Sequence, residues 1–206
     1  MSAEPGSAAP RARRGIEQIP WLYDACCALF ERFGLGRWRR WLVGGAEGRT
    51  LDVGCGTGRN LSLVGAGTRV IGLDPAREPL LPARRRAPRV PLVQGDAQAL
   101  PFRGGTFDTV ISGLVFCSVP DPRRGLAEVR RVLRPDGALR MLEHVRATGG
   151  LKARVQDRWQ PFWTRLTGGC HWNRDTERTV ETSGFAIDSA TRRARGDLRR
   201  FVARPR

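Results

Sequence analysis

Three glycines at alternate positions constrain this chain more than any other stretch. Gly54, Gly56 and Gly58 follow a short apolar lead-in, and apolar residues suited to a helix come directly after them. Glycine has no Cβ atom, so a glycine-rich turn between a strand and a helix lets the backbone approach a ligand closely. Such a turn also aims free N–H groups at the ligand from the helix N-terminus. The stretch therefore predicts a strand, a ligand-binding turn and a short helix that begins near Arg59.

The spacing of these glycines argues against a nicotinamide dinucleotide as the ligand. The dinucleotide fingerprint places its third glycine three positions after the second. That position is Arg59 here, and Gly58 comes one place early. A glycine-rich turn without any ligand stays open as the alternative reading of the motif taken alone.

Two further predicted strands end in a carboxylate. Residues 69–74 form an apolar, β-branched run that ends at Asp74, and residues 90–102 contain a third short strand followed by Gly95, Asp96 and Ala97. Runs of this length and composition favour buried strands. A carboxylate at the end of the second strand can accept hydrogen bonds from both hydroxyls of a ribose. With Asp52 before the glycine turn, three acids on three successive strands predict one shared ligand site.

The later segments continue an alternation of strands and helices. Residues 106–121 are near-continuously apolar, as in a central parallel strand, and this places residues 112–114 at its carboxyl end. Asp121 and Pro122 are typical of a helix start. Residues 185–206 can supply the last two strands, joined at residues 195–197. We also expect a helix to start near Pro79, a break or kink at Pro161, and a helix capped by Asn173.

Several of these stretches resemble one known family. The pattern D-x-G-x-G-x-G from Asp52 to Gly58 resembles motif I of the class I S-adenosylmethionine-dependent methyltransferases. Residues 129–145 are similar to a common sequence of the small-molecule branch, the methyltransferase type 11 domain. Residues 142–145 and 159–176 resemble the alkyl thiol methyltransferases and bacterial phospholipid N-methyltransferase-like proteins. The resemblance implies a single α/β domain with a Rossmann-like, doubly wound, seven-stranded sheet. That sheet is mostly parallel with an antiparallel last strand, and helices cover both faces.

The resemblance also implies the cofactor, S-adenosyl-L-methionine, and the residues that bind it. In this family the glycines admit the methionine part of the cofactor, the acid at Asp52 faces its ammonium group, and the acid at Asp96 holds the adenine amino group. The predicted cofactor-binding residues are Tyr23, Asp52, Gly54, Cys55, Gly56, Gly58, Asp74, Pro75, Asp96, Ala97, Ser112, Gly113 and Leu114.

The N-terminal region divides into two predicted parts. Residues 1–15 are expected to form a disordered lead-in, and residues 16–48 a helical lid that is followed by the methyltransferase domain over residues 49–206. In many family members the helix before the first strand lies over the cofactor, which makes Tyr23 the candidate for closing the pocket. Plain packing of this helix against the sheet remains an equal alternative.

Two residues at the end of the fifth predicted strand are the catalytic candidates. Glu143 and His144 are placed to face the acceptor, although a structural hydrogen bond would explain His144 as well. For Cys170 and His171 a structural role is favoured. The five cysteines show no metal-ligand spacing, so we expect free thiols and no metal site; a site from His144, His171 and a cysteine is the weaker alternative.

The expected acceptor is a small apolar or amphiphilic molecule: a thiol, an amine or a lipid head group. Small-ligand sites are lined mostly by apolar and aromatic side chains, and six aromatic residues are expected around the acceptor: Trp21, Tyr23, Trp159, Phe162, Trp163 and Trp172. Two alternatives stay open. One is an RNA methyltransferase, because the formal net charge is +16, and the other is a non-catalytic binding protein. Scattered arginines make nucleic acid the less favoured partner, and no obligate protein partner is evident. We expect a cytoplasmic protein, or one peripheral at an anionic membrane, because the chain shows no apolar anchor like that of the mammalian relatives.

Overall fold

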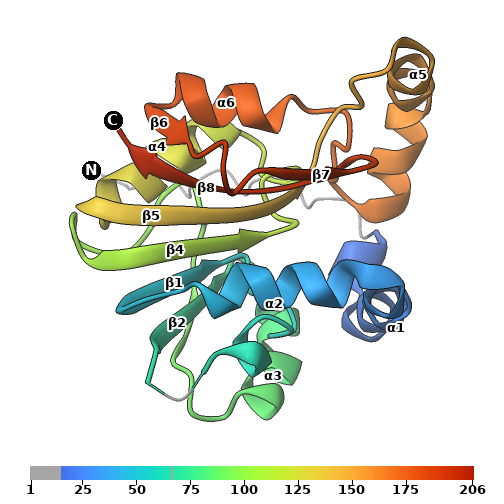
Figure 1. Cartoon of the computed structure of the whole chain (residues 1–206). Helices are drawn as coiled ribbons and strands as arrows, with labels where there is room; N and C mark the ends of the chain where they lie inside the picture. Colours follow the sequence, from blue (N-terminus) through green and yellow to red (C-terminus); the bar gives the residue numbers. More distant parts are fainter. Residues whose placement is uncertain (1–14, 66) are drawn as a thin grey trace, which may run out of the picture.

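The computed structural model describes residues 15–65 and 67–206, so nearly all of the lead-in expected over residues 1–15 lies outside the described residues. Within them, one sheet has the strand order β3-β2-β1-β4-β5-β8-β6, and β7 pairs with β8 (Figure 1). The strands are β1 (Arg49–Val53), β2 (Arg69–Asp74), β3 (Leu92–Gln94), β4 (Phe107–Gly113), β5 (Leu133–His144), β6 (Phe185–Ile187), β7 (Arg193–Arg195) and β8 (Leu198–Pro205).

The strand directions confirm the predicted fold class. β1 to β5 pair in parallel with their neighbours, and β8 runs antiparallel to both β5 and β6. The described sheet has eight strands where seven were expected, because the short β7 forms a hairpin with β8 around Gly196. The strand order reverses between β1 and β4, and open α/β sheets bind their ligands at such a switch point.

The helices lie on both faces of the sheet (Figure 1). They are α1 (Pro20–Phe30), α2 (Gly36–Gly44), α3 (Arg77–Arg86), α4 (Pro122–Val132), α5 (Gly150–Thr167) and α6 (Thr176–Thr182), with shorter helical turns η1 (Ile16–Gln18), η2 (Glu31–Leu35) and η3 (Leu61–Leu63). Successive strand residues point to opposite faces. Accordingly Val110 belongs to the apolar core under α4, and Ile111 to the core under α2. Among the described residues, none of the helices has the length and apolar character needed to cross a membrane.

Sequence signals set several helix ends as predicted. Asp121 caps α4, because its Oδ1 accepts hydrogen bonds from the N–H groups of Arg123 at 3.0 Å and Arg124 at 3.1 Å. The N-terminal helical segment bends at Gly34, whose φ of 112° is strained for any residue with a Cβ atom.

Four local predictions were wrong. The helix expected near Arg59 is only the single turn η3, since Val64 is already extended. α3 begins at Arg77 and continues through Pro82, although a helix start near Pro79 was expected.

α5 likewise continues through Pro161 to Thr167, where a break or kink was expected. A proline inside a helix removes its own backbone hydrogen bond, and α5 continues past Pro161 without that bond. Finally, α6 is capped by Asp175, because Asn173 is two residues too early and donates to Asp157.

Candidate active site

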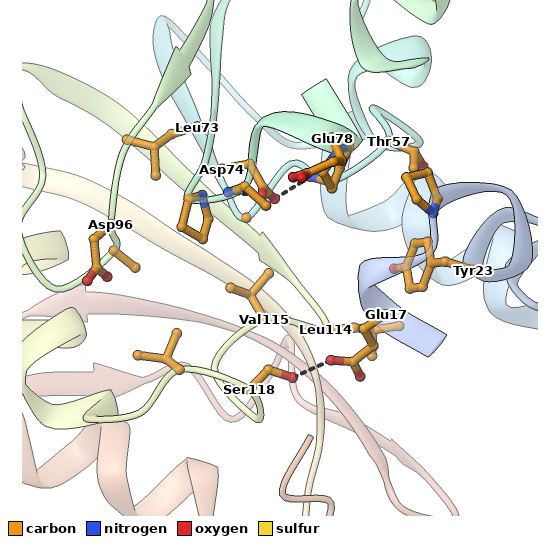
Figure 2. A pocket seen from close by; sticks show the side chains of 18 of the residues that line it. Glu17, Tyr23, Thr57, Leu73, Asp74, Glu78, Asp96, Leu114, Val115 and Ser118 are labelled. Carbon is orange, nitrogen blue, oxygen red and sulfur yellow. Dashed lines mark hydrogen bonds between the residues drawn. The ribbon is translucent and has the colours of Figure 1, made fainter. Parts of the chain in front are cut away.

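A pocket of about 660 Å³ opens at the carboxyl ends of the parallel strands. The glycine turn after β1 and the end of β2 form one wall, and the segment after β4 forms another, while η1 and α1 close it from the N-terminal side (Figure 2). Eight of the predicted cofactor residues line it: Tyr23, Gly54, Gly56, Asp74, Pro75, Asp96, Ala97 and Leu114.

The three glycines of the turn serve different purposes, although all have positive φ angles of 65°, 52° and 81°. A Cβ atom on Gly54 would meet the side chain of Val115. Gly58 does not line the pocket, because it packs against Ala83 of α3. A Cβ atom added to Gly58 would lie 3.0 Å from the Cα atom of Ala83. At Gly56 a Cβ atom would meet only the Gly54 carbonyl oxygen, at 4.0 Å, so this residue leaves free space on the pocket side.

Asp52 lies buried beneath the turn with one oxygen unpartnered. Its Oδ1 accepts a hydrogen bond from Asn60 Nδ2 at 3.2 Å, and Asn60 Oδ1 in turn accepts from Arg39 at 2.9 Å. Its Oδ2 is buried and has no hydrogen-bond partner among the described residues. Burial raises the pKa of Asp52 to about 7, against the opposing effects of Asn60 and Arg39. An unpartnered buried oxygen costs free energy, so this site suits a ligand that brings a donor.

Asp74 connects the end of β2 to the glycine turn. Its Oδ2 accepts from the Gly56 N–H at 2.9 Å and its Oδ1 from the Ala76 N–H at 3.0 Å. A carboxylate has about four acceptor positions, so two remain for a ligand. Burial raises its pKa. Asp96 lies at the other end of the pocket (Figure 2), and its exposed carboxylate accepts from the Gln98 N–H at 2.8 Å.

The other predicted cofactor residues support the pocket wall from behind. Cys55 is buried in a small apolar cluster with Leu61. Ser112 is fully buried, and Gly113 leaves no room for a side chain beside Asn60. Together with Asp52 and Gly58, these residues do not line the pocket.

Glu143 is fully buried and does not line the pocket, although we predicted that it faces the acceptor. Its Oε1 accepts hydrogen bonds from Ser112 Oγ at 2.8 Å and from the N–H groups of Val115 at 3.0 Å and Phe116 at 3.1 Å. Burial raises its pKa, while these donors oppose the shift. The carboxylate therefore acts as a positioning group that holds the segment after β4.

His144 also does not line the pocket, and it faces a pair of cysteines instead. Its Nδ1 lies 4.0 Å from Cys170 Sγ. Burial lowers the pKa of His144, but Cys170, Asp197 and Glu143 together raise it by more, so the net shift is upward. A hydrogen bond with Cys117 lowers the pKa of Cys170. His171 lies apart from this group, with its Nδ1 3.3 Å from Gln160 Nε2.

Glu17 is a pocket residue that the sequence did not indicate. It lies on η1, and its Oε2 accepts a hydrogen bond from Ser118 Oγ at 2.9 Å across the pocket wall (Figure 2). Burial raises its pKa to about 8. No motif surrounds Glu17; the only signal was an acid just before the predicted lid helix.

An ionic cluster fastens α1 to the glycine turn and α3. Asp24 accepts a hydrogen bond from Thr57 Oγ1 at 2.6 Å and forms ion pairs with Arg59 at 3.1 Å and Arg86 at 2.8 Å. The arginine and threonine donors lower the pKa of Asp24, although burial acts in the opposite direction. This cluster holds Tyr23 in the pocket wall, the position predicted for a lid residue.

Comparison with known proteins identifies the family. Residues 51–141 match the family model described as a methyltransferase domain. The chain is 32% identical over 166 residues to the phosphatidylethanolamine N-methyltransferase of Cereibacter sphaeroides, covering 78% of this chain and 81% of that protein. The chain belongs to the class I S-adenosylmethionine-dependent methyltransferases.

A second curated protein and a solved structure are also similar to this chain. It is 35% identical to human thiol S-methyltransferase TMT1B over 69% of this chain, and it spans 62% of the length of that protein. Its fold is similar to that of a SAM-dependent methyltransferase from Thermotoga maritima, with a TM-score of 0.62 and 20% identity, over 87% of this chain and 99% of that one.

S-adenosyl-L-methionine is the methyl donor of this family, and the pocket fits it. The free space at Gly56 admits the methionine part of the cofactor. Asp52, which the family resemblance pairs with the ammonium group, lies buried beneath the turn and outside the lining, with its Oδ2 unpartnered. Asp74 retains acceptor positions for ribose hydroxyls, and Asp96 lies at the end expected for adenine.

Proposed function

We propose that this methyltransferase transfers a methyl group from S-adenosyl-L-methionine to a small apolar or amphiphilic acceptor, such as a thiol, an amine or a lipid head group. The observation that carries the proposal is the composition of the pocket around Glu17. The lining includes the apolar residues Ile19, Pro20, Leu114, Val115, Val119 and Pro120. Besides Glu17, its carboxylates are those of Asp74, Asp96 and Glu78, the first two of which are assigned to the cofactor. The names of the thiol and phosphatidylethanolamine methyltransferase relatives support the same classes.

The cofactor, when bound, supplies an electrophilic methyl carbon for an in-line displacement. The protein must orient the acceptor, exclude water and receive a proton. A thiol must react as the thiolate, and an amine must be neutral. Glu17 is placed to take the proton, and its pKa of about 8 lies near neutral pH, where a group can both accept and release a proton. Ser118 holds the carboxylate in place through their hydrogen bond.

Exposed apolar side chains favour an amphiphilic acceptor and peripheral contact with an anionic membrane. Trp21 and Phe33 are 73% and 69% exposed near the pocket-closing helix, and Leu151 and Trp159 of α5 are 79% and 56% exposed. α5 and α1 both contact η1, so the helices that carry or flank these residues lie at the same end of the molecule (Figure 1). Not all of the expected aromatics contribute, because Trp163 and Trp172 stack on each other at 4.6 Å.

The test is a methyl-transfer screen with the purified chain and methyl-labelled cofactor. The panel contains alkyl thiols, primary amines, vesicles of phosphatidylethanolamine with anionic lipid, and RNA. We expect turnover of an apolar thiol, amine or lipid with little dependence on salt. Activity confined to RNA, falling steeply between low and physiological salt as phosphate contacts do, would refute the proposal.

The Glu17→Gln variant tests the proton acceptor within the same screen. We expect kcat to fall by about 10²-fold, the ordinary size of a general-base contribution, while cofactor affinity stays within about twofold. Glu181→Gln, an exposed glutamate of α6, is the matched control and should leave both values unchanged. A kcat for Glu17→Gln equal to that of the control would remove Glu17 from the reaction.

A further inference from the structure

Three side chains with soft metal-binding atoms converge directly behind the pocket wall. The Sγ atoms of Cys117 and Cys170 and a ring nitrogen of His144 all lie within 4.8 Å of one another. Both cysteines are 1% exposed, and His144 is partly buried. The three residues come from the segment after β4, the end of β5 and the loop after α5, so no sequence spacing reveals the group.

The backbone of each of these residues is held by other partners. The Cys117 carbonyl accepts from the His171 N–H at 2.8 Å, and the Cys170 N–H donates to Thr167 Oγ1 at 3.1 Å. The His144 carbonyl accepts from Thr176 Oγ1 at 3.3 Å. These backbone contacts fix the positions of the three residues. The Cys170 thiol is hydrogen-bonded to Cys117, His144 and Trp163, and a metal ion would replace its contacts with Cys117 and His144.

The donor set and its spacing select zinc. Two thiolates and an imidazole are soft or borderline ligands, which suit zinc and do not suit magnesium or calcium. Tetrahedral zinc, with Zn–S bonds of ~2.3 Å and Zn–N bonds of ~2.0 Å, sets its donor atoms roughly 3.5–3.8 Å apart. The 4.0 Å between Cys170 Sγ and His144 Nδ1 is close to this range. Three protein ligands leave a fourth position, as in catalytic zinc sites.

The group lies behind the part of the pocket wall that contains Glu17 and Ser118, because Cys117 directly precedes Ser118 in the chain. Cys117 Sγ is 3.8 Å from the hydroxyl of Ser118, which lines the pocket and donates to Glu17. We propose that Cys117, His144 and Cys170 bind Zn²⁺, and that its fourth ligand is the sulfur of a thiol acceptor that enters past Ser118, since none of the three residues lines the pocket itself. This inference rests on the proposed function, within which it singles out thiols as the acceptor class.

Zinc coordination would prepare the acceptor for methyl transfer. A thiol bound to zinc loses its proton, which leaves through the Glu17 carboxylate to water. A sulfur lone pair then forms the new S–CH₃ bond as the methyl–sulfonium bond breaks. The electron pair of the broken bond stays on the departing sulfide, and no oxidant or reductant is required. An amine acceptor would gain nothing comparable.

The first experiment measures metal binding apart from activity. The full chain is purified in a reducing buffer without chelator, and its zinc is counted by mass spectrometry and by competition with a fluorescent zinc indicator. We expect about one zinc per chain. Cys117→Ser, Cys170→Ser and His144→Ala should each retain less than about a tenth of this under competition. Cys26→Ser, a free cysteine outside the group, should bind as the parent does. Calorimetry with S-adenosylhomocysteine shows which variants remain folded.

The second experiment uses Co²⁺ in place of zinc. Thiolate-to-cobalt charge-transfer bands should appear and shift when an alkyl thiol is added, and they should not shift with an amine of the same chain length. A folded parent chain that binds no zinc, folded variants that bind as much as the parent, or cobalt bands indifferent to the thiol would overturn the inference. If the bands respond but no thiol, amine or lipid of the panel is methylated, the zinc site stands and the proposed function fails. Methylation of amines or lipids without any thiol would overturn the assignment of a thiol as the acceptor.

Discussion

Lowering the pH should weaken cofactor binding through Asp52, and Asp52→Asn should remove this dependence. The carboxylate faces the cofactor's ammonium group by family resemblance, and only its ionised form attracts that group. Burial raises the pKa of Asp52 to about 7. Below this pH the free protein carries a proton on Asp52 that binding must release, so affinity falls as the pH falls.

The expected change in the dissociation constant follows from the pKa of Asp52, which the groups around it help to set. Asn60 donates to Asp52, and Arg39 is one hydrogen bond further away; both favour the ionised form, and Asp74 opposes it. With a pKa of about 7, roughly three quarters of the carboxylate is ionised at pH ~7.5 and about a tenth at pH ~6. The dissociation constant should therefore rise about eightfold between these values, or about 1.2 kcal/mol.

Calorimetry with S-adenosylhomocysteine, which has the same amino-acid group, measures the effect. Titrations in two buffers of different ionisation enthalpy also count the proton released below about pH 7. Asp52→Asn should bind more weakly at pH ~7.5 and show no slope, while Asp136→Asn, an exposed control, should behave as the parent does. A parent chain without pH dependence, or an asparagine variant that keeps it, would refute the role given to Asp52.

Three other substitutions test the pocket and its lid. Asp74→Ala should weaken cofactor binding about tenfold or more, because two charge-assisted hydrogen bonds are lost; an unchanged dissociation constant in calorimetry would exclude Asp74 from the site. Gly54→Ala should lower both the melting temperature and cofactor affinity, because φ is 65° and the new methyl group meets Val115; a fully active, equally stable variant would contradict the geometry. Asp24→Ala releases Arg86 and should destabilise the fold by about 1 kcal/mol. Hydrogen exchange should also quicken over residues 20–30, and unchanged protection there would show that other contacts hold α1.

Local patterns were sufficient where the backbone decides the structure. The alternate glycines permit positive φ angles, and the turn between β1 and η3 adopts them. Asp121 caps α4 because a side-chain acceptor at that position satisfies free N–H groups within the same few residues. Pro161 shows the limit of such signals, since α5 continues through it to Thr167.

The candidate site likewise has one part that the sequence predicted and another that only the fold decided. The sequence alone determined the cofactor cradle, because Asp74 and Asp96 come at the ends of neighbouring parallel strands, where topology brings them to one edge. It also determined, through its resemblance, the family and the methyl donor. The strand ends and the glycine turn depend on local backbone conformation, which short stretches encode.

Only the tertiary structure decided which side chains meet at the acceptor end. Glu17 contacts Ser118 across 101 residues of chain. The placement of Glu143 and His144 also reversed our expectation, since neither lines the pocket. Contacts of this kind depend on how elements pack, and side-chain positions across elements have no periodicity that a sequence can display. The same packing brings Cys117 and Cys170 to His144 from three separate parts of the chain, so this group became visible only in the fold.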